Sequence, residues 1–170
     1  AGISGIGIAA HLAKNSPQRQ FEIIERRDSI GGTWDLFRYP GIRSDSDMST
    51  FGFNFKPWRS ANVLAAGPAI KGYLGEVVDE FDLKKKIHFK HRVLTANYDT
   101  AKKKWFVEIE DANQKRQTWI ANFVVGCTGY YNYDHGFEPD FPNKDIFKGQ
   151  FIHPQHWPEN LDYTGKKVVI

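Results

Sequence analysis

Apolar residues recur along the chain with two different spacings, which divide it into predicted helices and predicted strands. Residues 3 to about 14 carry small and apolar side chains at helical spacing, and Asn15-Ser16-Pro17 ends this segment because proline cannot continue a helix. A second helix is predicted from Pro68. Its buried face follows the spacing of one helical stripe and consists of Ile70, Tyr73, Leu74, Val77, Val78 and Phe81.

Strands are predicted in several short runs. Residues 20–25 form an apolar run that ends in an acid, with the length and composition of a strand. Further strand-like runs are 87–89, 92–98, 104–110 and 117–127. Within 104–110, Trp105, Val107 and Ile109 alternate with more polar neighbours, a period of two that is typical of a strand with one wetter face. The pattern predicts an antiparallel meander, at about residues 86–124, inserted in an α/β order.

Two stretches lack a regular pattern. Residues 28–62 hold many turn formers, and we expect a functional loop region with one short helix. Residues 130–163 are rich in aromatic residues, Pro, Gly and Asp, which predicts a structured connector. The chain opens at Ala1 and closes on apolar residues 168–170 after a turn, so we expect a fragment of a longer protein.

The composition of the 170 residues is that of a folded globular protein. Hydrophobic residues make up 41% and charged residues 25%, which argues against disorder, and a net charge of +3 does not require a nucleic-acid partner. The single cysteine, Cys127, excludes an intrachain disulfide and fits a reducing compartment, so we expect a cytoplasmic protein, with peripheral membrane association left open. No apolar run approaches the roughly 20 residues of a membrane span.

The first residues of the chain fit the end of a dinucleotide-binding loop. Gly2 and Gly5 have the spacing of the second and third glycines of G-x-G-x-x-G, with the first glycine expected just before Ala1. In such a loop the second glycine lets the backbone approach a pyrophosphate, and the free N–H groups of the helix start bind phosphate. Ser4 stands where its hydroxyl adds a hydrogen bond. The incomplete motif is weak by itself.

Glu25 strengthens the nucleotide interpretation. It ends a predicted strand and follows Gly5 by 20 residues, where a carboxylate accepts hydrogen bonds from ribose hydroxyls. Its charge would repel a 2′-phosphate, so FAD or NAD is favoured over NADP at this site. The alternative is a surface acid at a strand end, which the glycines and the intervening strand make the weaker interpretation.

Three longer motifs give the chain a family resemblance. Residues 32–45 fit the pattern G-x-W-x-x-x-x-Y-P-G-x-x-x-D, and residues 126–129 (GCTG) are like the turn that closes an FAD domain. Residues 147–158 fit the fingerprint F-x-G-x-x-x-H-x-x-x-W-P at Phe147, Gly149, His153, Trp157 and Pro158. The chain resembles type I Baeyer–Villiger monooxygenases among the flavin-containing monooxygenases. It is similar above all to the branch of the mycobacterial ethionamide-activating monooxygenase.

The resemblance implies an α/β fold, the N-terminal portion of a flavoprotein with two dinucleotide-binding domains. Residues 1–146 would be a Rossmann-like FAD-binding domain that lacks its first strand and carries the inserted antiparallel β-meander. Residues 147–164 would be the fingerprint linker, which in the family responds to cofactor binding and domain movement. Residues 165–170 would begin the first strand of a truncated NADP-binding domain.

The resemblance also implies roles for individual residues. The FAD pyrophosphate is expected at Gly2, Ser4 and Gly5, the adenosine ribose at Glu25, and the adenine end at the backbone of Val93. The flavin side is expected along Thr33, Trp34, Asp35 and Leu36. Where flavin meets nicotinamide, the resemblance implies Arg43, Ser44 and Asp45, with a catalytic role for Asp45 near the reacting centre. The main catalytic arginine of the family is expected beyond Ile170.

The implied activity uses FAD, NADPH and O₂. NADPH reduces FAD, and a C4a-peroxyflavin then inserts one oxygen atom into a small ketone, or oxidises the sulfur of a thioether or thioamide. One alternative is a flavin monooxygenase that oxidises amines and sulfides. The fingerprint of that class lacks the W-P ending that Trp157 and Pro158 supply here. Another is an FAD-binding fragment without activity of its own. A disulfide reductase would need a second cysteine in this region.

Other chemical interpretations are weaker. His153 and His156 lie three residues apart, but no acid or cysteine with ligand spacing accompanies them, so no metal site is expected. The lysine runs 84–86 and 102–104 fall at predicted turns, where solvated lysines are ordinary, so no nucleic-acid partner is expected. Cys127, beside apolar residues, is expected to be a buried core thiol rather than a nucleophile.

Overall fold

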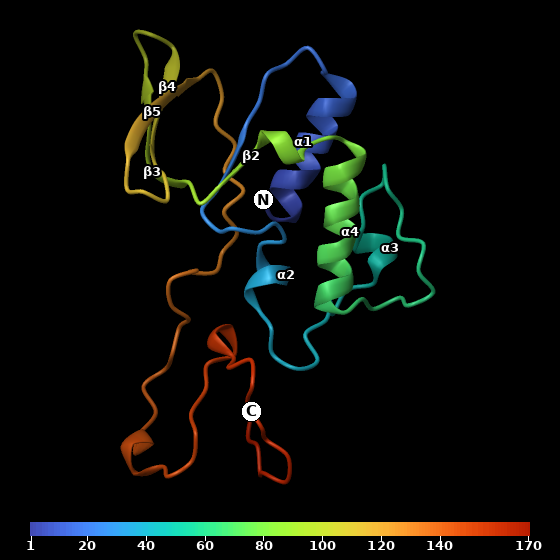
Figure 1. Cartoon of the computed structure of the whole chain (residues 1–170), viewed down its shortest axis with the longest axis vertical. Coiled ribbons are helices and arrows are strands. Elements are labelled where there is room, and N and C mark those ends of the chain that lie inside the picture. The colour runs from blue at the N-terminus through green and yellow to red at the C-terminus, as the bar shows by residue number, and fades with distance from the viewer.

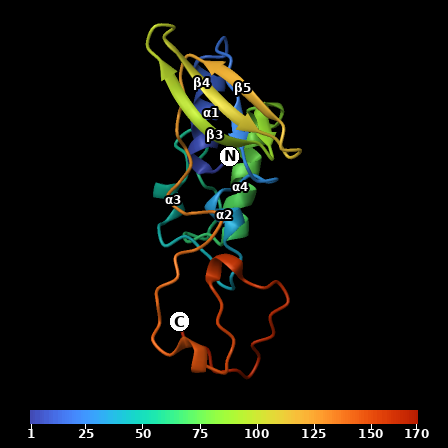
Figure 2. The same cartoon turned by 90° about the vertical axis from the view of Figure 1, so that its left-hand side faces the viewer.

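The computed structural model describes residues 1–170 (Figure 1). Its α-helices are α1 (Ile3–Asn15), α2 (Thr33–Leu36), α3 (Met48–Phe51) and α4 (Gly67–Glu80). Its strands are β1 (Ile23–Glu25), β2 (Ile87–Phe89), β3 (Arg92–Asp99), β4 (Lys104–Glu110) and β5 (Arg116–Ala121). Single 3₁₀ turns occur at η1 (Lys84–Lys86), η2 (Lys144–Ile146) and η3 (Pro154–His156). In both views the chain after β5 first passes back beside the other elements, and its last part then runs away from the helices and strands as an extended arm (Figures 1 and 2).

The main core lies between the two long helices. Ile6, Ala9 and Ala10 of α1 are buried in one cluster with four apolar residues of α4, namely Tyr73, Leu74, Val77 and Val78. The small side chains of α1 let the two helices approach closely. Both predicted helices are confirmed: α1 ends at Asn15 just before Pro17, and α4 has Pro68 in its first turn, where the missing N–H costs nothing.

The strands form two separate sheets. β1 and β2 pair in parallel, with Ile23 opposite Ile87, and β3, β4 and β5 form an antiparallel sheet in chain order. The predicted antiparallel meander is therefore present over 92–121, with a register shift between Val93 and Thr95. Residues 87–89, which the prediction grouped with it, instead pair with β1, because the chain crosses through α4 and returns parallel to it.

Some predicted strands are shorter in the structure or absent from it. β1 covers only the last three residues of the predicted run 20–25. The strand predicted over 117–127 ends at Ala121 in the structure, and the residues that follow belong to neither sheet. Among them, Phe123 is 82% exposed. Residues 165–170 also form no strand, and Val169 is 95% exposed. Unpaired backbone of this kind has no ladder to hold it in a strand.

The loop region 28–62 contains two short helices, α2 and α3, where one was expected. Asp47 begins α3 as an N-cap whose carboxylate accepts from the Thr50 N–H at 2.9 Å. Trp34 packs edge-to-face on Phe51 with ring centroids 5.7 Å apart, so the two helices contact each other. No helix of the chain is both long and apolar enough to cross a membrane.

Candidate functional site

The start of α1 is open to an anion. Gly2 is its N-cap and offers no side-chain acceptor, and no acidic residue lies in the first turn. The N–H groups of a first helical turn have no partner inside the helix, and they carry the positive end of the helix dipole. Ser4 is exposed on this turn. Gly2, Ser4 and Gly5 thus lie together at a helix start, as the sequence predicts.

Two other glycines close against this helix start. The Gly31 N–H donates to the Ala1 carbonyl at 2.9 Å. A β-carbon on Gly32 would lie 3.0 Å from the Gly2 Cα, and Gly32 has a φ of +56° that disfavours other residues. A β-carbon on Gly5 would lie 3.7 Å from that of Cys127. Cys127 is therefore half-buried against α1 rather than enclosed in a core, which corrects the prediction.

Glu25 lies beside the same helix start. It is buried at the end of β1, its Oε1 accepts from the Arg27 N–H at 2.9 Å, and its other carboxylate oxygen contacts the backbone nitrogen of Ala1, just before α1. The Glu25 carbonyl accepts from the His91 N–H at 3.0 Å, and His91 directly precedes β3. Val93 follows on β3 with its side chain 43% exposed. The predicted ribose and adenine residues are thus neighbours through the backbone.

Asp35 is the most heavily paired side chain of α2. It is 2% exposed, and it pairs with Lys71 of α4 at 2.5 Å, with Arg38 at 3.5 Å and with Arg27. Burial opposes its charge, but the hydrogen bonds from Lys71 and Arg27 outweigh that effect and lower the pKa of Asp35. Of the other predicted flavin-side residues, Leu36 is buried, and Thr33 and Trp34 are half-buried.

Tyr133 belongs to this neighbourhood and was missed by the sequence analysis. Its hydroxyl lies 3.5 Å from the position of a β-carbon on Gly32, and the Arg27 guanidinium lies 5.8 Å from its ring centroid. Burial raises the pKa of Tyr133, and a hydrogen bond with Thr33 partly offsets the rise. Next to it, Asp134 pairs with Arg26. No spacing motif marks these contacts, because over 90 residues separate the partners along the chain.

The three residues predicted to lie near the nicotinamide differ in exposure. Ser44 is buried, its N–H donates to the Ala65 carbonyl at 2.9 Å and its Oγ donates to the Ser46 carbonyl at 2.7 Å. Arg43 and Asp45 on either side are exposed. A hydrogen bond with Tyr130, burial and the nearby charge of Asp45 raise the pKa of Tyr131 to about 12. Asp45 is therefore close enough to Tyr131 for its charge to act on that hydroxyl.

The fingerprint residues lie on the extended arm. His153 begins η3, where its Nδ1 accepts from the Gln155 N–H at 3.1 Å. Gly149 contacts the ring of Phe147. Trp157, which Pro158 follows, packs edge-to-face on Tyr163 with ring centroids 6.0 Å apart. The arm returns to the site through Gln155, which is buried and donates to the carbonyl of Asn132 at 2.7 Å, one residue before Tyr133.

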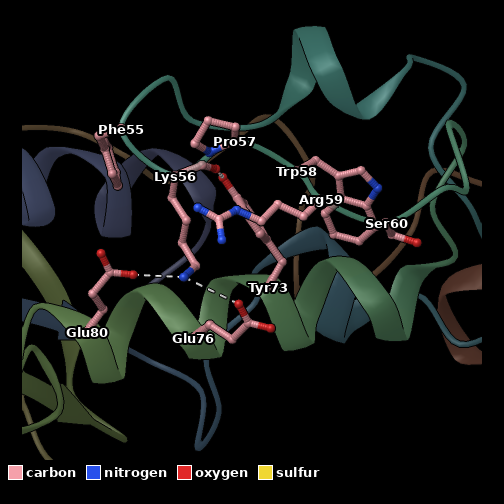
Figure 3. A pocket seen from close by; sticks show the side chains of 9 residues that line it. All are labelled: Phe55, Lys56, Pro57, Trp58, Arg59, Ser60, Tyr73, Glu76 and Glu80. Carbon is pink, nitrogen blue, oxygen red and sulfur yellow. Dashed lines mark hydrogen bonds and ion pairs between the residues drawn. The ribbon is translucent and has the colours of Figure 1, made fainter.

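A separate pocket of about 440 Å³ lies between α4 and residues 55–60 (Figure 3). Lys56 crosses it to pair with Glu80 at 2.7 Å and with Glu76 at 3.4 Å. Tyr73 forms part of its wall. None of the residues predicted to bind cofactor lines this pocket.

Two family models match the chain. The flavin-binding monooxygenase-like model matches residues 42–170, and a model of NAD(P)-binding Rossmann-like domains matches residues 1–64. Together they confirm the predicted α/β, Rossmann-like class and the predicted family resemblance.

Individual proteins agree with these models. The chain is 88% identical over 170 residues to a probable FAD-binding monooxygenase AlmA of Acinetobacter baylyi, and 55% identical to the FAD-containing monooxygenase EthA of Mycolicibacterium smegmatis. In both cases the alignment covers 100% of the chain and 34% of the relative, so the chain spans about a third of the length of these relatives.

A solved structure gives the same assignment. The cyclohexanone monooxygenase of Rhodococcus sp. Phi1 bound to NADP⁺ matches with a TM-score of 0.72 and 31% identity, over 95% of this chain and 30% of that one. The family model covers most of the chain, and the fold is shared with a flavoprotein monooxygenase. The chain belongs to the flavin-binding monooxygenase-like family.

Proposed function

We propose that this chain is the FAD-binding part of an NADPH-dependent monooxygenase that inserts one oxygen atom of O₂ into ketones and also oxidises thioethers. The observation that carries the proposal is the meeting of three features: the uncapped start of α1, the Gly31–Gly32 turn packed against it, and the Glu25 carboxylate at the end of β1. Each is suited to a different part of a dinucleotide.

The residues fit FAD in their chemistry. The free N–H groups near Gly2, Ser4 and Gly5 suit a pyrophosphate, and a glycine at position 2 keeps side chains out of its way. Glu25 suits the adenosine ribose, and the backbone of Val93 suits the adenine end. Thr33, Trp34 and Leu36 would face the flavin side, and Arg43, Ser44 and Asp45 the region where flavin meets nicotinamide. Asp45 would hold a hydrogen bond close to the reacting atoms.

When bound, the flavin supplies the redox chemistry: it takes hydride from NADPH and transfers oxygen from O₂ to the substrate. The chain's own part is to bind and orient the cofactor and to exclude water. Phe37 and Tyr131, which pack at 4.9 Å beside the Asp45 loop, provide apolar cover there. We propose 1–146 as the FAD-binding domain, 147–164 as the fingerprint linker and 165–170 as the start of an NADP-binding domain.

The choice of ketones rests on similarity to proteins that carry such names. The matched structure is a cyclohexanone monooxygenase, and the complete Trp157-Pro158 ending of the fingerprint favours the same class. The competing proposal is a flavin monooxygenase of amines and sulfides.

The experiment uses the full-length protein, purified and given NADPH, O₂ and a panel of cyclic ketones, aliphatic ketones and thioethers. Substrate-dependent loss of NADPH is followed together with product mass. An ester or lactone one oxygen heavier than the ketone supports the proposal. Bound FAD with only sulfoxide as product favours the competing class, and a protein without FAD contradicts both.

A further inference from the structure

Asp35 joins three parts of the fold through ion pairs. The carboxylate belongs to α2, Arg27 follows β1 and Lys71 lies on α4. Lys71 and Arg38 both contact Oδ1, and Arg27 contacts Oδ2. Both carboxylate oxygens are therefore engaged by basic groups of the chain itself.

The environment makes these pairs more important than surface ion pairs. Asp35 is 2% exposed, and the Arg27 Nε is buried without a hydrogen-bond partner. Exposed ion pairs contribute little to stability, whereas removing one partner of a buried pair leaves an uncompensated charge and costs several times more. Loss of the Asp35 charge would leave Arg27 and Lys71 to repel each other.

The same helix carries the glycines that close on the start of α1. Gly32 is the N-cap of α2, and Gly31 before it donates to the Ala1 carbonyl at 2.9 Å. A β-carbon on Gly31 would lie 3.1 Å from that of Asp35 and 3.3 Å from the Lys71 Cγ, so this turn packs directly on the ion-pair cluster. A shift of the cluster therefore moves Gly31–Gly32 relative to Gly2.

We propose that Asp35 is a positioning residue of the cofactor site: through Arg27 and Lys71 it holds α2 and the Gly31–Gly32 turn against the start of α1. Its part is to position rather than to bind the cofactor, because its carboxylate is 2% exposed and faces basic side chains of the chain itself. This refines the role that the family resemblance implies for it, and it rests on the proposed FAD site.

The test uses the full-length protein with Asp35→Asn, which keeps the size of the side chain and removes its charge. The apoprotein is titrated with FAD by quenching of flavin fluorescence, and the visible absorption bands of the bound flavin are recorded. We expect the Kd for FAD to rise at least about tenfold, and a tenfold rise corresponds to about 1.4 kcal/mol. We also expect the absorption bands of the bound flavin to shift. Glu80→Gln is the matched control, since it removes a carboxylate that pairs with Lys56 across the separate pocket.

Lys71→Gln is the second variant, since it removes one anchor and keeps the Arg27 pair. It should change FAD affinity and flavin bands in the same direction by a smaller amount, and it decides the question if Asp35→Asn does not fold. Lower unfolding temperatures in both variants with wild-type affinity and spectrum would overturn the inference and make Asp35 a purely structural residue. A wild-type protein that binds no FAD would overturn the proposed function as well.

Discussion

Gly32 and Gly2 lie in direct backbone contact, although 30 residues separate them in the sequence. The Cα of Gly2 is 3.0 Å from where a β-carbon of Gly32 would be, and 3.5 Å separates the Gly32 Cα from the corresponding position on Gly2. The restriction falls on Gly32, whose β-carbon would crowd the Gly2 backbone and whose φ is +56°, whereas a β-carbon on Gly2 would make only ordinary contact with Gly32. The contact sets the distance between α1 and α2.

Replacing Gly32 by alanine should therefore loosen the site. The new methyl group meets the Gly2 backbone, and the backbone angles of Gly32 (φ +56°, ψ −122°) cost a non-glycine residue about 1–3 kcal/mol. We predict a lower unfolding temperature and weaker FAD binding in the full-length protein, measured by thermal unfolding and fluorescence titration.

Gly72→Ala is the control for this substitution. Gly72 lies inside α4 with open space around its missing side chain, so alanine should stabilise the helix by about 0.5–1 kcal/mol. If both alanine variants behave alike, the close contact between Gly32 and Gly2 does not constrain the site.

Tyr73 ties residues 53–56 to α4. Its hydroxyl accepts from the Phe53 N–H at 2.7 Å and donates to the Lys56 carbonyl at 2.6 Å. Tyr73→Phe keeps the ring in the core but leaves both backbone groups without that partner, at a cost of about 1–3 kcal/mol. Denaturant unfolding should show this loss, while Tyr98→Phe, at a half-exposed ring, should show almost none. Equal effects at the two positions would refute the predicted role of the Tyr73 hydroxyl.

Asp35 should make stability depend on pH under acidic conditions. Its pKa is lower in the folded chain than the value of about 3.9 in an unfolded one, so folding favours the ionised carboxylate. Its contribution is fully present above about pH 4 and disappears as the pH falls through the folded pKa. We predict that the free energy of unfolding falls more steeply with acid in the wild type than in Asp35→Asn. Parallel curves would show that the cluster does not hold the carboxylate ionised.

Much of the fold was predictable because it is encoded locally. The stripe from Ile70 to Val78 identifies α4, and alternation around Trp105 identifies β4. The parallel pairing of Ile23 with Ile87 was not predictable in the same way, because it depends on the path of the chain through α4. The strand predicted up to Cys127 was too long, since apolar composition alone cannot supply a neighbouring strand.

The candidate site divides in a similar way. Glycine spacing and the distance to Glu25 pointed to the residues that meet at the start of α1. The roles of Arg27, Lys71 and Tyr133 were invisible, because each depends on contacts with Asp35 or Thr33 that only the folded chain creates. The individual cofactor contacts stay predictions.

The account depends most directly on whether Glu25 and the start of α1 hold FAD. The decisive measurement is the FAD content and affinity of the full-length protein, with wild-type Glu25 and with Glu25→Gln. We predict one FAD per wild-type chain, and binding weaker by about 1.5–3 kcal/mol in the variant, since a charged acceptor for ribose hydroxyls is lost. A wild-type protein without flavin, or equal affinity in the two proteins, would contradict the account.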